Sequence, residues 1–142
     1  MYLLDTNVVS ELRRPRPHGA VLDWIAGVPA ERLFMSAVTV GEIQAGIEIT
    51  REQDSAKADE LEDWLDKVLA SYGVLAMDAS AFREWARLMH RRSDTMIEDA
   101  MIEDAMIAAT AIVNRLTVVT RNVSDFSQLE VALLNPFERE VL

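Results

Sequence analysis

Short apolar runs alternate along the chain with longer segments in which apolar residues recur every three or four positions. Val40, Ile43 and Ile47, for example, lie on one side of a helix. Runs of strand length occur at residues 2–4, 33–36, 74–77, 117–120 and 131–134. Strands that alternate with helices favour a parallel sheet with helices on both faces, so the pattern predicts an α/β sandwich.

The helical segments predicted by this spacing fill the intervals between the strands. They are residues 7–12, 20–26, 39–49, 52–70 and 80–91, and a last helix that begins at Glu98 or Glu103 and ends at Asn114. Residues 13–19 hold two prolines, which cannot continue a helix, and three arginines, so this segment is predicted to be a basic loop. Gly73 is expected to end the helix predicted at residues 52–70. The pattern contains no linker, and residues 1–142 are predicted to form a single domain.

Composition narrows the possible chemistry. The 142 residues include 14 Lys and Arg against 24 Asp and Glu, a formal charge of −10, and no cysteine. Disulfides, thiolate nucleophiles and cysteine-bound metals are thereby excluded. Two histidines, at positions 18 and 90, leave little for a histidine zinc site. No apolar run approaches the roughly 20 residues that span a bilayer, and the N-terminus lacks the features of a signal peptide. We therefore expect a cytoplasmic protein with no membrane association.

Four carboxylates fall where an α/β sheet places its ligands, beyond the carboxyl ends of the strands. Asp5 directly follows residues 2–4, and Asp125 lies in the loop that leaves residues 117–120. Glu42 and Asp104 stand near the starts of two helices. Carboxylates brought together repel one another, and each pKa rises unless a cation compensates. Oxygen ligands without His or Cys select Mg²⁺ or Mn²⁺, which commonly recruit phosphate oxygens as well.

The third acidic position is complicated by a tandem repeat. Residues 96–100, Met-Ile-Glu-Asp-Ala, recur letter for letter as residues 101–105, which provides two candidates, Asp99 and Asp104. Five residues turn a helix by about 500°, so these two side chains would lie roughly 140° apart and only one can face the site. Positions three, four and seven after Asp104 are Ile, Ala and Ala, a stripe that can be buried, whereas the same stripe from Asp99 includes Glu103. We predict that Asp104 faces the site.

Four ordered motifs carry a family resemblance. They are Leu4-Asp5-Thr6-Asn7, Val40-Gly41-Glu42-Ile43, Asp104-Ala105-Met106-Ile107-Ala108-Ala109-Thr110 and Thr117-Val118-Val119-Thr120-Arg121-Asn122-Val123-Ser124-Asp125-Phe126. Together they resemble the PIN domain family, in particular the VapC-like and FitB-like toxins of bacterial toxin–antitoxin pairs. The resemblance spans essentially the whole chain.

This resemblance implies a fold, an activity and partners. The fold would be a Rossmann-like α/β/α sandwich with a central parallel sheet, and the activity would be ribonuclease cleavage that depends on Mg²⁺ or Mn²⁺. Asp5, Glu42, Asp104 and Asp125 would bind the metal, with Thr6 and Asn122 as polar supports. The resemblance further implies a cognate antitoxin that blocks the acidic pocket, and a homodimer. The repeat at residues 96–105 departs from the family pattern and could displace a ligand.

A net charge of −10 opposes attraction to RNA, so binding would have to use local basic patches. Two groups of arginines are candidates for RNA binding. Arg13, Arg14 and Arg16 lie in the predicted basic loop, and Arg83, Arg87 and Arg91 are spaced four residues apart on one helix stripe. Arginine suits bidentate phosphate contact and base stacking. The arginines of the helix stripe could instead form a solvated or salt-bridged face. Both groups of arginines could also bind a protein partner.

Two functions of different classes therefore remain open. The first is a metal-dependent ribonuclease toxin. The second is a catalytically impaired PIN-like binding module that acts through its antitoxin or dimer interface, the repeat having broken the site. A third, a phosphoacceptor receiver domain, is disfavoured because such a site needs a lysine after a late strand, and the lysines here are Lys57 and Lys67 in the middle of the chain.

Overall fold

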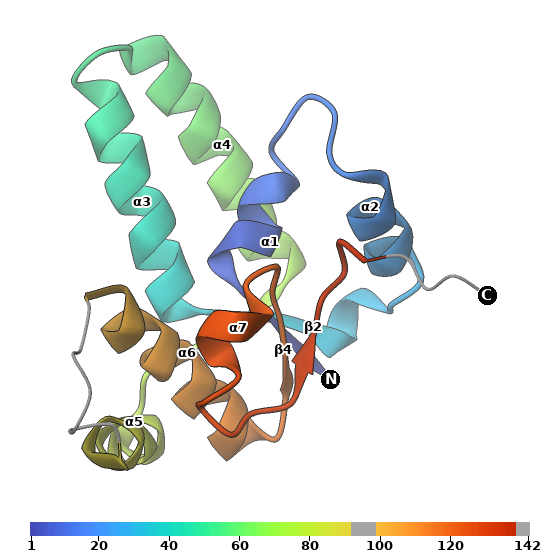
Figure 1. Cartoon of the computed structure of the whole chain (residues 1–142). Helices are drawn as coiled ribbons and strands as arrows, with labels where there is room; N and C mark the ends of the chain where they lie inside the picture. The colour runs from blue at the N-terminus through green and yellow to red at the C-terminus, as the bar shows by residue number, and fades with distance from the viewer. Residues whose placement is uncertain (92–98, 139–142) are drawn as a thin grey trace.

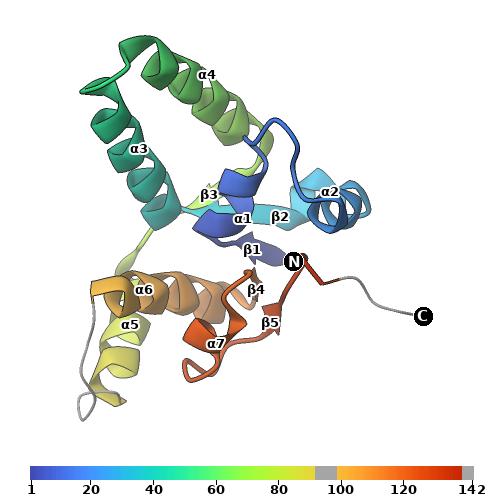
Figure 2. The ribbon, with the colours of Figure 1, turned by 45° about the horizontal axis from the view of Figure 1, so that its top comes forward.

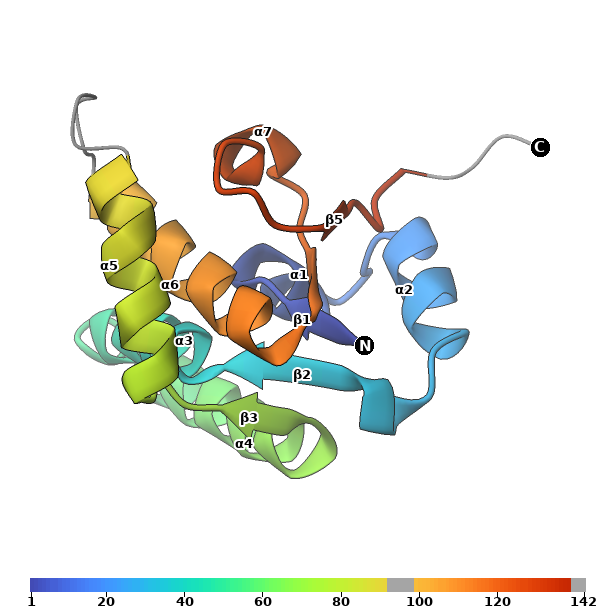
Figure 3. The same ribbon diagram turned by 90° about the horizontal axis from the view of Figure 1, so that it is seen from below.

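The fold is that of a computed structural model, which describes residues 1–91 and 99–138, with the side chains of residues 99 and 100 excepted. Five parallel strands form one sheet in the order β3-β2-β1-β4-β5 (Figure 3). Their bounds are β1 Tyr2–Leu4, β2 Leu33–Ser36, β3 Gly73–Leu75, β4 Thr117–Val119 and β5 Leu133–Leu134. The prediction of an α/β fold with a central parallel sheet is confirmed.

Seven α-helices in the described residues cover the two faces of the sheet (Figure 2). The helices are α1 Thr6–Glu11, α2 Gly19–Ala26, α3 Ala37–Arg51, α4 Ser55–Ser71, α5 Ala79–Arg91, α6 Asp99–Asn114 and α7 Val123–Phe126, with a short 3₁₀ helix at Ala30–Arg32. Helices α1, α2 and α4 pack on one face, and α5, α6 and α7 on the other. The molecule is thus a three-layer sandwich.

The alternation of side chains along each strand divides the core in two. Leu3 on β1 is in register with Phe34 on β2 and Val118 on β4, and all three contact the core beneath α5 and α6. The following residues in each strand, among them Leu4 and Val119, contact the opposite core beneath α1, α2 and α4. Consecutive residues of a strand point to opposite faces, so short strands are enough to hold both helical layers.

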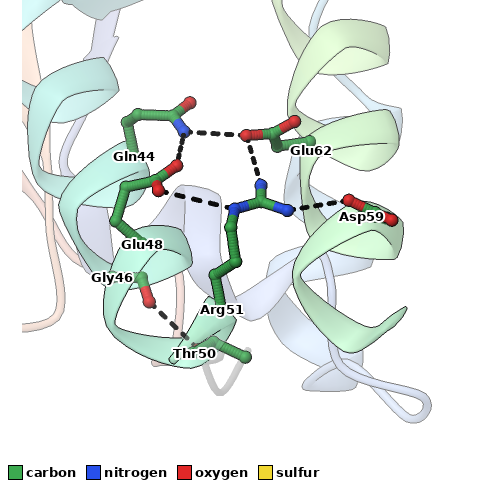
Figure 4. Close-up of polar contacts among 7 residues, drawn as sticks. All are labelled: Gln44, Gly46, Glu48, Thr50, Arg51, Asp59 and Glu62. Atoms are coloured by element: carbon green, nitrogen blue, oxygen red, sulfur yellow. Dashed lines mark hydrogen bonds and ion pairs between the residues drawn. The ribbon is translucent and has the colours of Figure 1, made fainter. Parts of the chain in front are cut away.

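Helices α3 and α4 form an antiparallel pair that projects from the sandwich (Figure 1). Ile47, Ala58 and Leu65 form a small buried cluster between them. At their surface, Arg51 forms ion pairs with Glu48, Asp59 and Glu62, and these residues are drawn in Figure 4. We call these four residues, with Gln44, the helix-pair clamp. The α3–α4 pair therefore has its own apolar and polar contacts, largely separate from the sheet.

The structure corrects several predicted boundaries. Helix α4 ends at Ser71, and Gly73 begins strand β3 instead of ending the helix. A Cβ atom at Gly73 would lie 2.7 Å from Cδ1 of Phe34, so the ring of the neighbouring strand requires a glycine there. The strands predicted at residues 74–77 and 131–134 are shorter and begin at Gly73 and Leu133. The loop predicted after residues 117–120 contains helix α7.

None of the helices in the described part of the chain is long and apolar enough to cross a membrane.

Candidate functional site

Asp5 stands at the carboxyl end of the central strand β1 and caps helix α1. Its Oδ1 accepts a hydrogen bond from the backbone N–H of Thr6 at 2.8 Å, and its Oδ2 accepts one from the hydroxyl of Thr120 at 2.8 Å. Only 6% of Asp5 is exposed. Both oxygens of this carboxylate are therefore held in place by donors from two segments of the chain.

Asn7 links Asp5 to the segment that follows strand β4. Its side-chain amide donates to Oδ2 of Asp5 at 3.2 Å and to the hydroxyl of Thr120 at 3.3 Å. Its side-chain oxygen accepts the backbone N–H of Arg121 at 3.2 Å. Leu4 of β1 is in register with Val119 of β4. The residues that follow them, Asp5 and Thr120, therefore lie side by side at this edge of the sheet.

Burial is the main reason that the pKa of Asp5 is raised. The hydrogen bonds from Thr120 and Thr6 act in the opposite direction, and the negative charge of Asp125 raises the pKa further. Asp5 is thus a desolvated carboxylate that lies within electrostatic reach of another acidic group.

Glu42 lies in the second turn of α3. Burial, followed by the charges of Glu103 and Asp5, raises its pKa to about 7, against a hydrogen bond with Thr6 that lowers it. Asp104 contributes the smallest of the raising effects. Without a cation beside it, Glu42 is therefore partly protonated at neutral pH.

Asp104 lies in α6 and behaves in the same way. Burial, followed by the charges of Asp5, Asp125 and Glu103, raises its pKa to about 7. The four predicted carboxylates thus lie within electrostatic reach of one another, although they are distant along the chain. The structure brings Asp104 to this group, as the stripe in the repeat predicts, while the side chain of Asp99 lies outside the described residues.

The acidic group has two properties that suit a divalent cation. Three of its carboxylates, those of Asp5, Glu42 and Asp104, are desolvated, and in the described ranges no Lys, Arg or His forms an ion pair with any of the four. They do not, however, form a ready ligand shell, because no three acidic or histidine side chains of the described residues are close enough to hold an ion together. Binding would need the side chains to move closer.

The remaining predicted positions lie around this group. Asp125 is an exposed residue of helix α7 rather than of a loop. The hydroxyl of Thr6 lies 3.0 Å from that of Thr39, and the backbone N–H of Asn122 donates to the hydroxyl of Thr120 at 3.0 Å. Thr6 thus contacts the acidic residue Glu42, whereas Asn122 contacts the group only through Thr120.

Sequence reasoning missed three residues that act on the acidic group. Thr120 and Asn7 hold Asp5, and Glu103 raises the pKa of both Glu42 and Asp104. Thr120 directly follows β4, whereas the sequence pattern predicts it as the last residue of that strand, so its place at the carboxyl end of the strand was an available signal. Glu103 was overlooked because it belongs to the repeat.

A cavity of about 260 Å³ opens beside Glu42, between helices α1, α3 and α4. Its walls combine polar side chains near the acidic group with apolar ones from the projecting helix pair. The residues are Thr6, Ser10, Arg13, Glu42, Ile43, Gly46, Ile47, Thr50, Leu61 and Trp64. One arginine of the predicted basic loop, Arg13, therefore lines the same hollow as an acidic residue of the site.

The two predicted arginine groups have different surroundings. On α5, Arg87 is paired with Glu84 at 2.9 Å, and Arg91 is paired with Glu84 at 3.3 Å and Glu130 at 3.0 Å. The salt-bridged interpretation thus describes these two residues, while Arg83 forms no ion pair within the described part of the chain. In the basic loop, Arg14 pairs with Glu11 at 3.2 Å, and no described carboxylate pairs with Arg13 or Arg16.

Known proteins with similar sequences align with nearly the whole chain. The family model of the PIN domain matches residues 2–131. The VapC ribonuclease Y4jK of Sinorhizobium fredii is 37% identical over 140 residues, which cover 97% of this chain and 99% of that protein. Toxin FitB of Neisseria gonorrhoeae is 32% identical over 139 residues, which cover 96% of this chain and 99% of that protein.

A solved structure agrees with these sequence relatives. The crystal structure of FitAcB from Neisseria gonorrhoeae superposes with a TM-score of 0.86 at 31% identity, over 98% of this chain and 100% of that one. The family match, the two relatives and this superposition each extend over nearly the full length. The chain belongs to the PIN domain family.

Proposed function

We propose that the protein is a metal-dependent endoribonuclease, the toxin of a toxin–antitoxin pair, which hydrolyses phosphodiester bonds in RNA. The observation that carries the proposal is a group of four carboxylates that have no basic partner among the described residues. Asp5, Glu42 and Asp104 are desolvated, and the exposed Asp125 lies beside them. Relatives named as a ribonuclease and as a toxin support the same activity. The fold alone would not, because Rossmann-like sandwiches support many functions.

The four carboxylates would hold Mg²⁺ or Mn²⁺, since hard oxygen donors without nitrogen or sulfur favour these ions. A bound ion of this kind lowers the pKa of water and neutralises charge on phosphate oxygens. The pKa values of Glu42 and Asp104 are about 7, so both side chains are partly protonated near pH 7. Binding an ion between the carboxylates would require both groups to lose these protons.

The neighbouring polar residues orient this group. The donors from Thr6 and Thr120 fix both oxygens of Asp5. Asn7 holds Asp5 and the segment after β4 in one hydrogen-bonded unit. Thr6 links the end of β1 to α3, because its backbone N–H donates to Asp5 and its hydroxyl lies 3.0 Å from that of Thr39. A fixed ligand set of this kind reduces the reorganisation needed for in-line attack on a phosphate.

The proposal also includes partners and a location. The toxin would act in the cytoplasm on RNA, would be blocked by a cognate antitoxin and would form a homodimer. Structures of related complexes, such as FitAB bound to a DNA fragment, support an antitoxin partner.

Purified protein incubated with RNA and either Mg²⁺ or Mn²⁺ tests the proposal. We expect cleavage that chelation abolishes and that Asp5→Asn abolishes with the thermal unfolding transition retained. Asp66→Asn is a matched control, because Asp66 is exposed on α4 away from the site. Cleavage that persists in folded, metal-supplied Asp5→Asn protein would contradict the proposal.

The alternative, an impaired binding module, is favoured by the tandem repeat directly ahead of Asp104. It predicts neither Mn²⁺ binding nor RNA cleavage by the unaltered chain, while binding of the antitoxin persists. Deleting one copy of the repeat shows whether the insertion has inactivated a complete metal site or whether the chain lacks such a site. Cleavage that appears only after the deletion would show that the insertion inactivates an otherwise complete site. Removal of either copy produces the same sequence, so a single variant suffices.

A further inference from the structure

Arg121, a residue of the fourth motif, is held against an aromatic ring near the acidic group. Its guanidinium carbon lies 4.7 Å from the centroid of the Phe137 ring. The ring of His18 packs against Phe137 edge-on, with 5.3 Å between ring centroids. A guanidinium stacked on a ring keeps the N–H donors at its edge available, and it loses little entropy when those donors bind.

The basic loop lies next to this stacked pair. Glu11 is 7% exposed, and its carboxylate accepts the backbone N–H of His18 at 2.9 Å and the side chain of Arg14 at 3.2 Å. Burial acts against ionisation, but these two hydrogen bonds and the charges of Arg14 and Arg121 leave the pKa of Glu11 lowered. An ionised, buried Glu11 thus anchors both ends of the loop and leaves the other arginines of this region to solvent.

The arginines of this region surround open space. Glu11, Arg14, Pro15, Arg16 and His18 line a hollow of about 460 Å³. In the described part of the chain, Arg13, Arg16 and Arg121 have no carboxylate within ion-pair distance, and Glu138, which follows Phe137, forms no ion pair either. Four guanidinium groups therefore gather on one flank of a chain whose net charge is −10.

Two of these arginines are connected to the acidic group. The backbone of Arg121 is bound to Asn7, and Asn7 is bound to Asp5. Arg13 lines the cavity that contains Thr6 and Glu42. An extended polymer whose scissile phosphate lies at the acidic group would therefore pass over basic side chains as it leaves.

We propose that Arg13, Arg14, Arg16 and Arg121, the last supported by Phe137, form a binding surface for the phosphates of single-stranded RNA that flank the scissile bond. We call these five residues the basic flank. The proposal rests on the proposed function, which supplies RNA as the substrate. Single-stranded RNA is favoured because it presents both phosphates for the arginines and bases for stacking at the rings of Phe137 and His18.

Binding is measured separately from cleavage. In the Asp5→Asn background, with chelator present, fluorescence anisotropy records the affinity for a labelled single-stranded RNA of mixed sequence at several salt concentrations. For single strands, log K falls with log salt by about 0.7 for each phosphate contact. We expect the double variant Arg16→Gln, Arg121→Gln to weaken binding about tenfold and to reduce this slope by about 1.4.

The matched control removes the same charge elsewhere. Arg32→Gln, Arg115→Gln also deletes two exposed arginines, one in the 3₁₀ helix before β2 and one between α6 and β4. We expect less than a twofold change in affinity from this control. Phe137→Leu keeps every charge, so it should weaken binding with the salt slope unchanged, and it should move Arg121 without unfolding the domain.

Equal effects of the two double variants would overturn the basic flank, because net charge alone would then explain them. An unchanged affinity for RNA combined with lost binding of the antitoxin would also overturn it and would assign the surface to a protein. If the wild-type chain cleaves RNA while the double variant binds normally, the basic flank fails and the proposed function stands. If the flank binds RNA as expected but no metal supports cleavage, the proposed function fails instead.

Discussion

Two clusters of acidic side chains in this molecule differ in whether a basic side chain neutralises them. In the helix-pair clamp, three carboxylates surround Arg51, whose guanidinium lies 2.6 Å from Glu62, 2.8 Å from Asp59 and 3.4 Å from Glu48 (Figure 4). Gln44 donates to Glu48 at 3.0 Å and to Glu62 at 3.1 Å. At the candidate site, four carboxylates gather with no such cation among the described residues.

Burial makes the difference more pronounced. The clamp carboxylates keep between 41% and 71% of their side chains exposed, so water and Arg51 both stabilise their charge. The hydrogen bond to Asp59 also raises the pKa of Arg51. Asp5 is almost fully buried, and the pKa values of Glu42 and Asp104 are about 7. The chain thus neutralises one acidic cluster itself and leaves the other for a cation from outside.

The largest expected effect is on the rate of RNA cleavage, when one carboxylate is removed from either cluster and the two variants are compared. Asp104→Asn should reduce RNA cleavage at least about 100-fold, because a displaced or missing ligand misplaces the reacting groups. Asp59→Asn in the clamp should leave cleavage unchanged. The measurement is the initial rate at saturating Mn²⁺, with thermal unfolding as the control for folding.

The same assay resolves the tandem repeat. Asp99→Asn should retain nearly full activity, because Asp104 and Asp99 lie roughly 140° apart around an unbroken helix. Activity that depends on Asp99 and not on Asp104 would show that the first copy supplies the ligand. The helical comparison of the two stripes would then be wrong.

The second effect is stabilisation by metal. At a concentration one hundred times its dissociation constant, Mn²⁺ should raise the free energy of unfolding by about 2.7 kcal/mol, since it binds only the folded chain. Asp104→Asn should remove most of this gain and Asp59→Asn none of it. Differential scanning calorimetry with and without Mn²⁺ at pH 7.5 measures the effect, and an equal loss in both variants would contradict the comparison.

The third effect is the dependence of stability on pH. Folding raises the pKa of Glu42 from 4.5 to about 7 and that of Asp104 from 3.8 to about 7, so between these values the folded chain holds protons that the unfolded chain has lost. Without metal, these two groups should therefore make the protein less stable as the pH rises from 5 to 8. Both groups are half-exposed, so the change is about 1 kcal/mol for each.

Mn²⁺ should reverse this pH trend, because the metal competes with the protons for the same oxygens. In the presence of Mn²⁺, stability should rise over the range in which the metal-free protein loses it. Asp104→Asn should flatten both curves relative to the unaltered protein, which separates these groups from others that titrate. Parallel curves with and without metal would show that Glu42 and Asp104 do not bind it.

Much of the site could be predicted because its acidic positions follow local rules. Asp5 directly follows a strand, and the carboxyl ends of parallel strands meet at one edge, so Asp5 and Asp125 could be placed from periodicity alone. Glu42 and Asp104 needed only the apolar stripe of their helices. The cluster itself is therefore a consequence of topology.

The contacts that hold this cluster depend on long-range geometry. The hydroxyl of Thr120 reaches Asp5 across 115 positions, and Arg91 pairs with Glu130 across 39, so neither contact has a signature in local sequence. The stripe of arginines on α5 is correctly placed on one helix, and Glu84, three residues before Arg87, is a partner that helical spacing allows, but Glu130 could not be inferred as a partner of Arg91. Gly73 was interpreted as a helix terminator because the ring of Phe34 that requires it belongs to another strand.

The smallest expected effect concerns the clamp itself. Arg51→Gln should lower the free energy of unfolding only slightly, because it removes several partly exposed ion pairs, each of which contributes little. Arg32→Gln, which removes an arginine that forms no ion pair within the described residues, should change stability by less. Urea unfolding at low and high salt measures both, and the difference between them should shrink at high salt.

The Arg51→Gln variant also tests the comparison between the two clusters. It leaves Glu48, Asp59 and Glu62 without their cation, so if the absence of a cation were sufficient for a metal site, the variant would bind Mn²⁺ at the clamp. We expect no such binding in calorimetric titration with Asp5→Asn in the background, because these side chains are exposed and water already stabilises their charge. Burial is what raises the free energy of the ionised carboxylates at the candidate site, and a cation binds tightly where it relieves that cost. Tight Mn²⁺ binding by the Arg51→Gln clamp would show instead that charge alone distinguishes the two clusters.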